Sequence, residues 1–373
     1  MRVIIAGGGT GGHLFPALAL AQELRGGYGA DVLLVGAGSG TEGAILTQAC
    51  PEPLRGSSFP VVTIRVKGLK GVGLGGKLHA LAMLPSALRD SRAILKAFRP
   101  QVVVGMGGYA SGPLVLVAAL SGLKTLIHEQ NAFPGLANRI LARFVDIVAL
   151  STASAAPYLK AKRVEVVGLP IREELLKADR AEAQETLGLS RGRLTVFVFG
   201  GSQGAHRINE ALVEALPYLR GLGEKLQFLH ATGERDHPMV KQAYEEAGLS
   251  ALVRPFFREM SLAYAAADLS ICRAGASTIA ELAALGKPSL LIPYPYAAND
   301  HQRLNALALV RIGGARMLLD RELSGEAIAA FLEEVLAKPS LLEEMGRRAK
   351  ELGRPDAASR LADLVCGLAK GKS

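Results

Sequence analysis

Cysteine is scarce in this 373-residue chain, and long apolar runs are missing from it. Its three cysteines, Cys50, Cys272 and Cys366, lack CxxC spacing, which argues against a zinc site and against a disulfide framework. No stretch approaches the roughly 20 apolar residues of a membrane span, and the apolar run after Arg2 is too short for a signal peptide. We therefore expect a chain that stays in a reducing cytoplasm and does not cross the bilayer.

Several ligand signatures are also missing. The loop from Gly7 to Gly12 satisfies G-x-G-x-x-G, but Val35, at the end of the next predicted strand, is followed by Gly36 instead of an acidic residue, which disfavours NAD or FAD binding. No Gly-Lys-Ser/Thr follows a glycine-rich loop, so Walker A is absent. No Asp-x-Asp occurs, so a metal-bridged diphosphate is not indicated.

What is present is a regular alternation of apolar runs and helical patterns. With 49% apolar residues the chain has enough material for two buried cores. Alternating strands and helices indicate βαβ units, so the predicted fold class is α/β, with two doubly wound Rossmann-like domains facing a central cleft. The predicted strands are Arg2–Ala6, Val32–Val35, Val102–Gly105, Thr125–His128, Ile147–Leu150, Leu194–Phe199, Leu226–His230, Leu269–Cys272 and Ser289–Ile292.

The segment Val167–Pro170 is the predicted linker. It divides an N-terminal domain, 1–167, from a C-terminal domain, 168–373, whose last helix is able to pack back on the N-terminal domain. Positive charge is confined to one part of the chain, since residues 1–165 hold 17 Lys and Arg against 8 Asp and Glu while the remainder is balanced. This asymmetry indicates an anionic partner for one half: nucleic acid, a membrane surface or a phosphorylated substrate.

The stretch from Cys272 to Asn305 carries the strongest ligand pattern. A helix is predicted to start near Gly275, with Ser277 and Thr278 at capping positions and Glu281 in the first turn. Free N–H groups and the helix dipole make such a start an anion site, and Glu281 is then placed to accept hydrogen bonds from a sugar diol. Ordinary helix capping is the alternative.

Other polar residues follow predicted strands in the N-terminal half. His13, directly after the first glycine loop, suits a general base, or else hydrogen-bonds its own loop. The run His128–Asn131 ends another strand, where open α/β sheets bind ligands. Gly105–Pro113 is a second glycine-rich turn. Arg172 follows the linker and is placed to reach a diphosphate, with a solvated arginine as the alternative.

Six motifs together resemble a known family. They are GGGTGGHLFP (7–16), GMGGYASGP (105–113), HEQN (128–131), VGLPIR (167–172), FGGSQGAHRIN (199–209), and RAGASTIAEL with HQRLNA (273–282 and 301–306). In this order they resemble the MurG-type N-acetylglucosaminyltransferases of bacterial cell-wall synthesis, in the GT-B superfamily. The resemblance covers essentially the whole chain.

The resemblance implies an inverting transfer of N-acetylglucosamine from UDP-N-acetylglucosamine to O4 of the muramyl sugar of undecaprenyl-pyrophosphoryl-muramyl-pentapeptide. It implies that the C-terminal domain binds the UDP-sugar. The sequence itself indicates no metal, and we expect no cofactor. His13 is the expected base, with Glu129 next. His301 falls where some members carry glutamine. The implied donor-binding residues are Thr10, Gly11, Gly12, Asn131, Arg172, Ser202, Phe257, Ala276, Ser277, Thr278, Ile279, Ala280, Glu281 and Gln302.

A lipid-linked acceptor implies a peripheral enzyme on the cytoplasmic face of the cell membrane. The segment 65–99 is rich in Lys and Arg interleaved with apolar residues, and we expect it to dock on anionic lipid. Packing of its apolar residues on the N-terminal sheet is the alternative. A non-catalytic module binding nucleic acid or membrane explains the charge but not the glycine loops, so we expect no nucleic-acid partner. A related GT-B transferase with another UDP-sugar or a diglucosyl-lipid acceptor is the remaining alternative.

Overall fold

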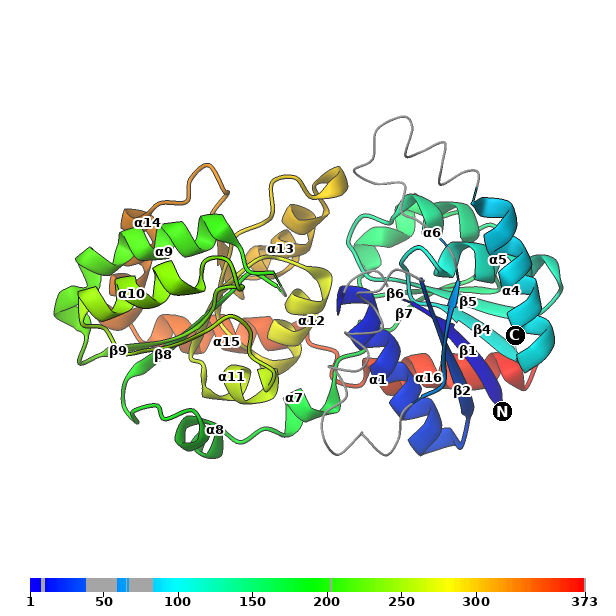
Figure 1. Ribbon diagram of the computed structural model, residues 1–373, viewed down its shortest axis with the longest axis horizontal. Helices are drawn as coiled ribbons and strands as arrows, with labels where there is room; N and C mark the ends of the chain where they lie inside the picture. Colours follow the sequence, from blue (N-terminus) through cyan, green and yellow to red (C-terminus); the bar gives the residue numbers. More distant parts are fainter. Residues whose placement is uncertain (8–10, 38–58, 65, 67–82, 202, 372–373) are drawn as a thin grey trace. The chain divides into compact units, whose positions relative to one another are not determined.

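The computed structural model describes residues 1–7, 11–37, 59–64, 66, 83–201 and 203–371. The chain forms two compact units, each with its own core. The first comprises Met1–Arg172 and Asp356–Ser373, and the second comprises Glu173–Pro355. Both are open parallel sheets covered by helices, as the α/β prediction requires (Figure 1).

The first unit contains a seven-stranded sheet in the order β3-β2-β1-β4-β5-β6-β7, and every pairing in it is parallel. Its strands are β1 (Arg2–Ala6), β2 (Asp31–Ala37), β3 (Val61–Ile64), β4 (Val102–Gly105), β5 (Lys124–Glu129), β6 (Ile147–Leu150) and β7 (Val164–Val166). Its helices are α1 (Gly11–Tyr28), α4 (Leu84–Phe98), α5 (Ser111–Leu120), α6 (Leu136–Leu141), the 3₁₀ turn η2 (Ala153–Tyr158) and α16 (Ala357–Ala369).

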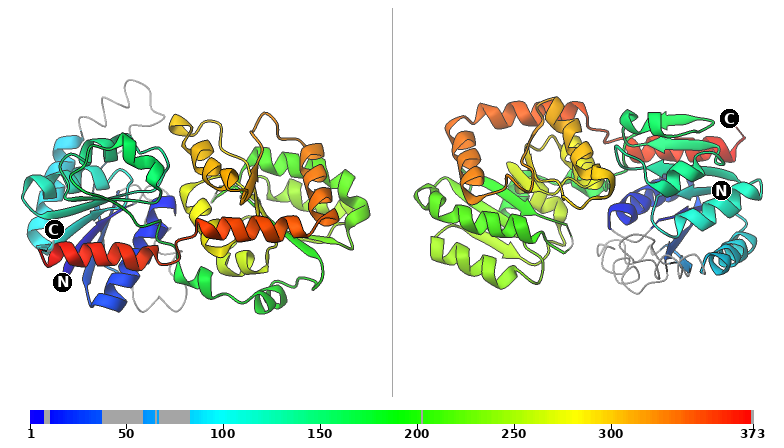
Figure 2. Two further views of the ribbon diagram at one scale, coloured as in Figure 1. Left: turned by 180° about the vertical axis from the view of Figure 1, so that it is seen from behind. Right: turned by 90° about the horizontal axis from the view of Figure 1, so that it is seen from above.

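The last helix, α16, packs beside α1 on one face of this sheet, so both chain ends belong to the first unit (Figures 1 and 2). Leu361 and Val365 of α16 are fully buried in one core cluster with Leu20 and Leu24 of α1. Tyr28 at the end of α1 donates a 2.6 Å hydrogen bond to Asp363, which raises the pKa of the tyrosine to about 12.

The second unit contains a six-stranded parallel sheet in the order β10-β9-β8-β11-β12-β13. Its strands are β8 (Leu194–Phe199), β9 (Leu226–Ala231), β10 (Ala251–Arg254), β11 (Leu269–Cys272), β12 (Ser289–Leu291) and β13 (Ala315–Met317). Its helices are α7 (Glu173–Lys177), α8 (Arg180–Thr186), α9 (His206–Leu219), η3 (Arg220–Leu222), α10 (His237–Ala247), α11 (Met260–Ala266), α12 (Ala276–Leu285), η4 (Ala298–Asp300), α13 (His301–Arg311), α14 (Gly325–Ala337) and α15 (Ser340–Glu351).

The central strands of both sheets are buried on both faces, which is why they read as continuous apolar runs in the sequence. In each sheet the chain order reverses at one place, between β1 and β4 in the first unit and between β8 and β11 in the second. Open α/β sheets bind ligands beyond the carboxyl ends of the strands at such a reversal. The loops after these four strands are therefore the places to look for a site.

Candidate active site

In the first unit, three motif loops follow the neighbouring strands β1, β4 and β5. His13 lies in the first turn of α1, and its half-buried imidazole contacts the loop after β4. A Cβ added at Gly107 would lie 2.6 Å from Nδ1 of His13. Gly107 also has a backbone φ of +90°, which residues with a Cβ rarely adopt. Glycine at position 107 thus makes room for the ring of His13.

Glu129, the second expected base, ends β5 and is buried. Its carboxylate accepts hydrogen bonds from the backbone N–H of Asn131 at 2.9 Å, from the N–H of Gly135 at 3.0 Å and from the Asn138 amide at 2.9 Å. The Asn131 amide adds a 3.4 Å bond. Glu129 therefore closes the loop that carries Asn131 back onto the first turn of α6.

His128 and Gln130 join that loop to the rest of the unit. The buried His128 contacts the carbonyl of Gly168 through Nε2 at 2.8 Å, and Gln130 donates to the carbonyl of Met106 at 3.0 Å. Burial lowers the pKa of His128 to about 4, and the charge of nearby His13 acts in the same direction. His128 is therefore neutral near pH 7 and donates from Nε2, which fixes its tautomer.

Arg172 also belongs to the first unit and lies beside the beginning of α1. Its guanidinium is 4.6 Å from the ring centroid of Phe15, a cation–π contact. The same ring edge lies 3.1 Å from where a Cβ at Gly11 would be. Gly11, Gly12, Asn131 and Arg172 are thus the described residues of this unit that the resemblance linked to the donor, whereas Thr10 lies outside the described residues.

In the second unit, α12 begins with Gly275 as its N-cap, as predicted, and ends at Gly286 in a left-handed conformation. The prediction that Ser277 and Thr278 occupy capping positions is wrong, because both residues lie inside the first turn of the helix. The N-cap is Gly275, and no side chain makes a cap hydrogen bond there. Glu281 lies beyond the first turn, not within it. Because the N-cap is glycine, its side chain cannot cap the first turn of this ten-residue helix.

The Glu281 carboxylate is buried, and Tyr264 of α11 donates a 2.9 Å hydrogen bond to its Oε2. Tyr264 is itself fully buried among Phe197 and Phe199 of β8, with ring centroids 5.7 Å apart in both pairs. This aromatic packing fixes the carboxylate with respect to β8. The side chain is therefore held rigidly, as a specific acceptor must be.

The loop after β12 carries Gln302 and His301 at the beginning of α13. The Gln302 side-chain oxygen accepts from the N–H of Tyr294 at 2.9 Å, and His301 contacts the carbonyl of Ala298 at 2.8 Å. Asn299 and Asp300 in this loop have φ +55° and +52°, which is strained for residues other than glycine. Phe257, another residue that the resemblance linked to the donor, is fully buried.

The loop after β8 leads into α9, whose N-cap, Ala205, is likewise not a side-chain cap. Gly204 has φ +75°, and a Cβ there would lie 2.0 Å from the carbonyl of Thr232. Only glycine lets these two backbones meet so closely. Ser202 lies outside the described residues.

Among the residues that the structure describes, no group of three or more His, Cys, Asp or Glu side chains is placed to hold a metal ion.

Two family models match the chain: the glycosyltransferase family 28 N-terminal domain over residues 3–150, and the C-terminal domain over residues 195–361. A UDP-N-acetylglucosamine–N-acetylmuramyl-(pentapeptide) pyrophosphoryl-undecaprenol N-acetylglucosamine transferase of Syntrophus aciditrophicus is 46% identical over 364 residues, covering 97% of each chain. The transferase of the same name from an Anaeromyxobacter species is 45% identical, over 99% of this chain and 94% of that one. The chain belongs to the MurG family of glycosyltransferases.

A solved MurG structure, from Acinetobacter baumannii, superposes with a TM-score of 0.73 at 31% identity, over 98% of this chain and 99% of that one. The GT-B fold predicted from the sequence is thereby confirmed. A UDP-GlcNAc 2-epimerase from Neisseria meningitidis, solved with UDP-GlcNAc bound, has a TM-score of 0.69 at 12% identity and shares the fold alone.

Among the residues that the structure describes, no helix is long and apolar enough to span a membrane. Two of its cysteines, Cys272 and Cys366, are buried free thiols, and Cys50 lies outside the described residues. Sequence reasoning missed Tyr264, which no motif marks because it lies 17 residues before Glu281 on another helix. It also missed Asn138, which holds Glu129 from α6.

Proposed function

We infer that this chain transfers N-acetylglucosamine from UDP-N-acetylglucosamine to O4 of the muramyl sugar of undecaprenyl-pyrophosphoryl-muramyl-pentapeptide, with inversion at the anomeric carbon. The observation that supports this function is the similarity to a family of transferases with this activity. One of them is 45% identical to this chain over 99% of its length. The product is the disaccharide lipid from which peptidoglycan is built.

We assign the acceptor chemistry to the first unit. His13 removes the proton from the O4 hydroxyl as that oxygen attacks the anomeric carbon. Its ring is positioned by Gly107 and lies near His128, which is neutral and so adds no charge that would oppose proton uptake. Glu129 is the second candidate base, but four donors already occupy its carboxylate, and this favours a role in holding Asn131.

We assign donor binding chiefly to the second unit. Glu281 accepts hydrogen bonds from the ribose, and the first turn of α12, from Ala276 to Ala280, receives a phosphate. The beginning of α9 offers a second set of N–H groups. As UDP departs, negative charge grows on its diphosphate, and these helix starts together with Arg172 stabilise it without reorganisation. The remaining donor residues proposed are Thr10, Gly11, Gly12, Asn131, Ser202, Phe257 and Gln302.

We further propose that the enzyme works at the cytoplasmic face of the membrane, where its lipid acceptor is held. Of the docking segment 65–99, residues 65 and 67–82 lie outside the described residues. In α4, Ala87 and Leu95 are buried in the core of the first unit, so these two residues pack on the sheet, whereas Leu84 at its beginning is exposed. The outer face of α4 is basic, with Arg89, Arg92 and Lys96 exposed, and the exposed Arg99 follows as its C-cap. Each basic group near an anionic surface contributes about 1 kcal/mol.

Liposome co-sedimentation tests the docking. Binding should require anionic lipid, weaken with salt, and fall when Lys67, Lys70 and Lys77 are changed to Glu. A matched variant with Arg191, Arg220 and Arg311 of the second unit changed to Glu should bind like wild type. Equal binding of all three proteins would exclude segment 65–99 as the docking surface.

The transfer itself is tested with radiolabelled UDP-N-acetylglucosamine and a short-chain lipid acceptor analogue. We expect labelled disaccharide lipid. Label that moves only from another UDP-sugar, or only to a diglucosyl lipid, would favour the related GT-B transferase instead.

A further inference from the structure

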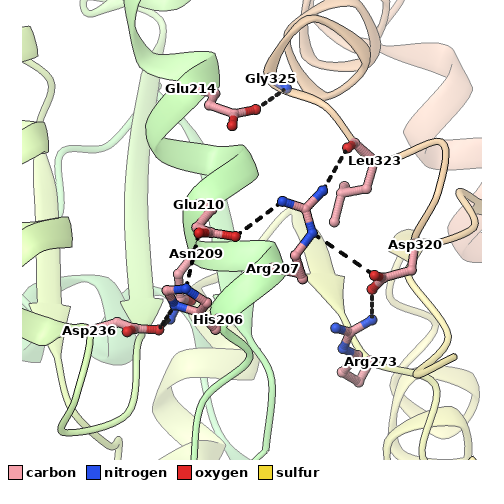
Figure 3. Close-up of polar contacts among 10 residues, drawn as sticks. All are labelled: His206, Arg207, Asn209, Glu210, Glu214, Asp236, Arg273, Asp320, Leu323 and Gly325. Carbon is pink, nitrogen blue, oxygen red and sulfur yellow. Dashed lines mark hydrogen bonds and ion pairs between the residues drawn. The ribbon is translucent and has the colours of Figure 1, made fainter. Parts of the chain in front are cut away.

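The two helix starts assigned to the donor are joined by one carboxylate from a distant segment. Asp320 lies in the connection between β13 and α14 and belongs to none of the sequence motifs. Its Oδ1 accepts a 2.8 Å hydrogen bond from Arg273, the first residue after β11. Its Oδ2 lies 4.0 Å from Nε of Arg207, the second residue of α9 (Figure 3).

The ion pair between Asp320 and Arg273 is shielded from water. Their side chains are only 19% and 12% exposed, so charge-assisted bonds between them are screened less than those on the surface. Arg207 is more open, at 46%, and is also held by Glu210 at 3.1 Å and by the carbonyl of Leu323 at 3.4 Å. Asp320 therefore acts mainly on Arg273.

Arg273, in the turn before α12, also contacts the loop that follows β12. The Nη1 atom that contacts Asp320 also donates to the carbonyls of Ile292 and Pro293, each at 3.2 Å. Its guanidinium lies 5.6 Å from the ring centroid of Tyr294, whose N–H bonds Gln302. The turn before α12 and the loop that carries Gln302 are thus held to each other by one arginine.

We propose that Asp320 is a positioning residue for donor binding. It fixes the direction of the Arg273 guanidinium, and that arginine keeps the α12 turn and the Gln302 loop in one arrangement. Without the carboxylate, the guanidinium loses its fixed direction, and the two segments lose their common support. This inference rests on the proposed placement of the donor in the second unit.

The test compares Asp320→Asn, Asp320→Glu and a matched control, Glu322→Gln, which removes a carboxylate from the same connection. For Asp320→Asn we expect the KM for UDP-N-acetylglucosamine and the Kd for UDP to rise about tenfold, as for loss of one hydrogen bond to a charged group. The kcat and the KM for the acceptor should change less than twofold. Asp320→Glu should recover most of the donor affinity, and the control should match wild type.

A double-mutant cycle shows whether Asp320 acts through Arg273. Arg273→Gln should weaken UDP binding, and adding Asp320→Asn to it should weaken binding no further. Independent, multiplying effects would overturn the inference, and so would a parallel loss of kcat, acceptor affinity and Tm that Glu at position 320 does not rescue. Unchanged UDP affinity in Asp320→Asn would overturn the inference alone. Wild-type protein that bound no UDP would overturn the donor assignment and the inference with it.

Discussion

The imidazole of His13 lies against Gly107, at a place where a Cβ would come within 2.6 Å of Nδ1. The two residues follow strands β1 and β4, which are neighbours at the reversal point of the first sheet. The contact therefore joins two loops that are about 90 residues apart in the sequence. It sets the position of the side chain that we propose as the base.

Gly107→Ala should lower kcat strongly, because the added methyl group displaces the His13 ring. The left-handed backbone adds a cost of roughly 1–2 kcal/mol in folding stability. Gly112→Ala is the matched control, since nothing lies within 4 Å of a Cβ at Gly112. Steady-state kinetics with saturating acceptor, together with thermal unfolding, check both variants. Equal kcat for Gly107→Ala and wild type would show that the ring position does not matter.

Replacing His13 by Gln should reduce kcat about 10²–10⁴-fold, the usual contribution of a general base. UDP affinity measured by calorimetry should stay within a factor of two, because we place His13 on the acceptor. A variant that kept the wild-type kcat would transfer the role to another residue, Glu129 first.

Glu129→Gln separates a base from a loop anchor. As an anchor, Glu129 accepts from Asn131, Gly135 and Asn138, so the substitution should lower stability and weaken donor binding while leaving a measurable kcat. Asn138→Ala, which removes one of these donors and keeps the Glu129 carboxylate, should produce a milder form of the same change. Loss of kcat in Glu129→Gln alone, with wild-type behaviour of Asn138→Ala, would point to catalysis instead.

Glu281→Ala should weaken UDP binding by roughly 1.5–3 kcal/mol, the value of hydrogen bonds to a charged group. Tyr264→Phe serves as the control, because it removes the internal donor and leaves the carboxylate in place. Calorimetry should therefore show a smaller loss for the tyrosine variant. Wild-type UDP affinity in a folded Glu281→Ala protein would remove Glu281 from the donor site.

The stability of the protein should fall between about pH 6.5 and pH 4. The pKa of His128 is about 4 in the folded protein, against 6.5 for an unburied imidazole, so below pH 6.5 the unfolded chain binds the extra proton. The slope reaches about 1.4 kcal/mol per pH unit for one such group. His230, whose pKa burial lowers to about 3, acts the same way in the second unit. Denaturant midpoints followed by circular dichroism should show a shallower pH dependence for His128→Gln than for wild type, and an unchanged pH dependence would contradict this account.

The sequence predicted the central strands of both sheets, and the structure confirms them with small changes at their ends. The four strands that it did not predict, β3, β7, β10 and β13, are the edge strands of the two sheets. Edge strands here are short and only partly buried, so they carry no continuous apolar run to mark them.

The site was predicted where backbone geometry demands glycine or where polar residues directly follow a buried strand. Gly107 and Gly204 belong to the first kind. Tyr264 and Asp320 could not be predicted, because their partners are 17 and 47 residues away and the contacts depend on helix packing and on a loop path. Local sequence carries no information about either.

The anomeric configuration of the product tests the central claim most directly. A single displacement driven by one base on the acceptor must invert the α-linked donor, so the disaccharide lipid made from UDP-N-acetylglucosamine should be β-1,4-linked by NMR. The His13→Gln protein should form the same product far more slowly. An α-linked product, or hydrolysis of the donor without transfer to the acceptor, would contradict the account.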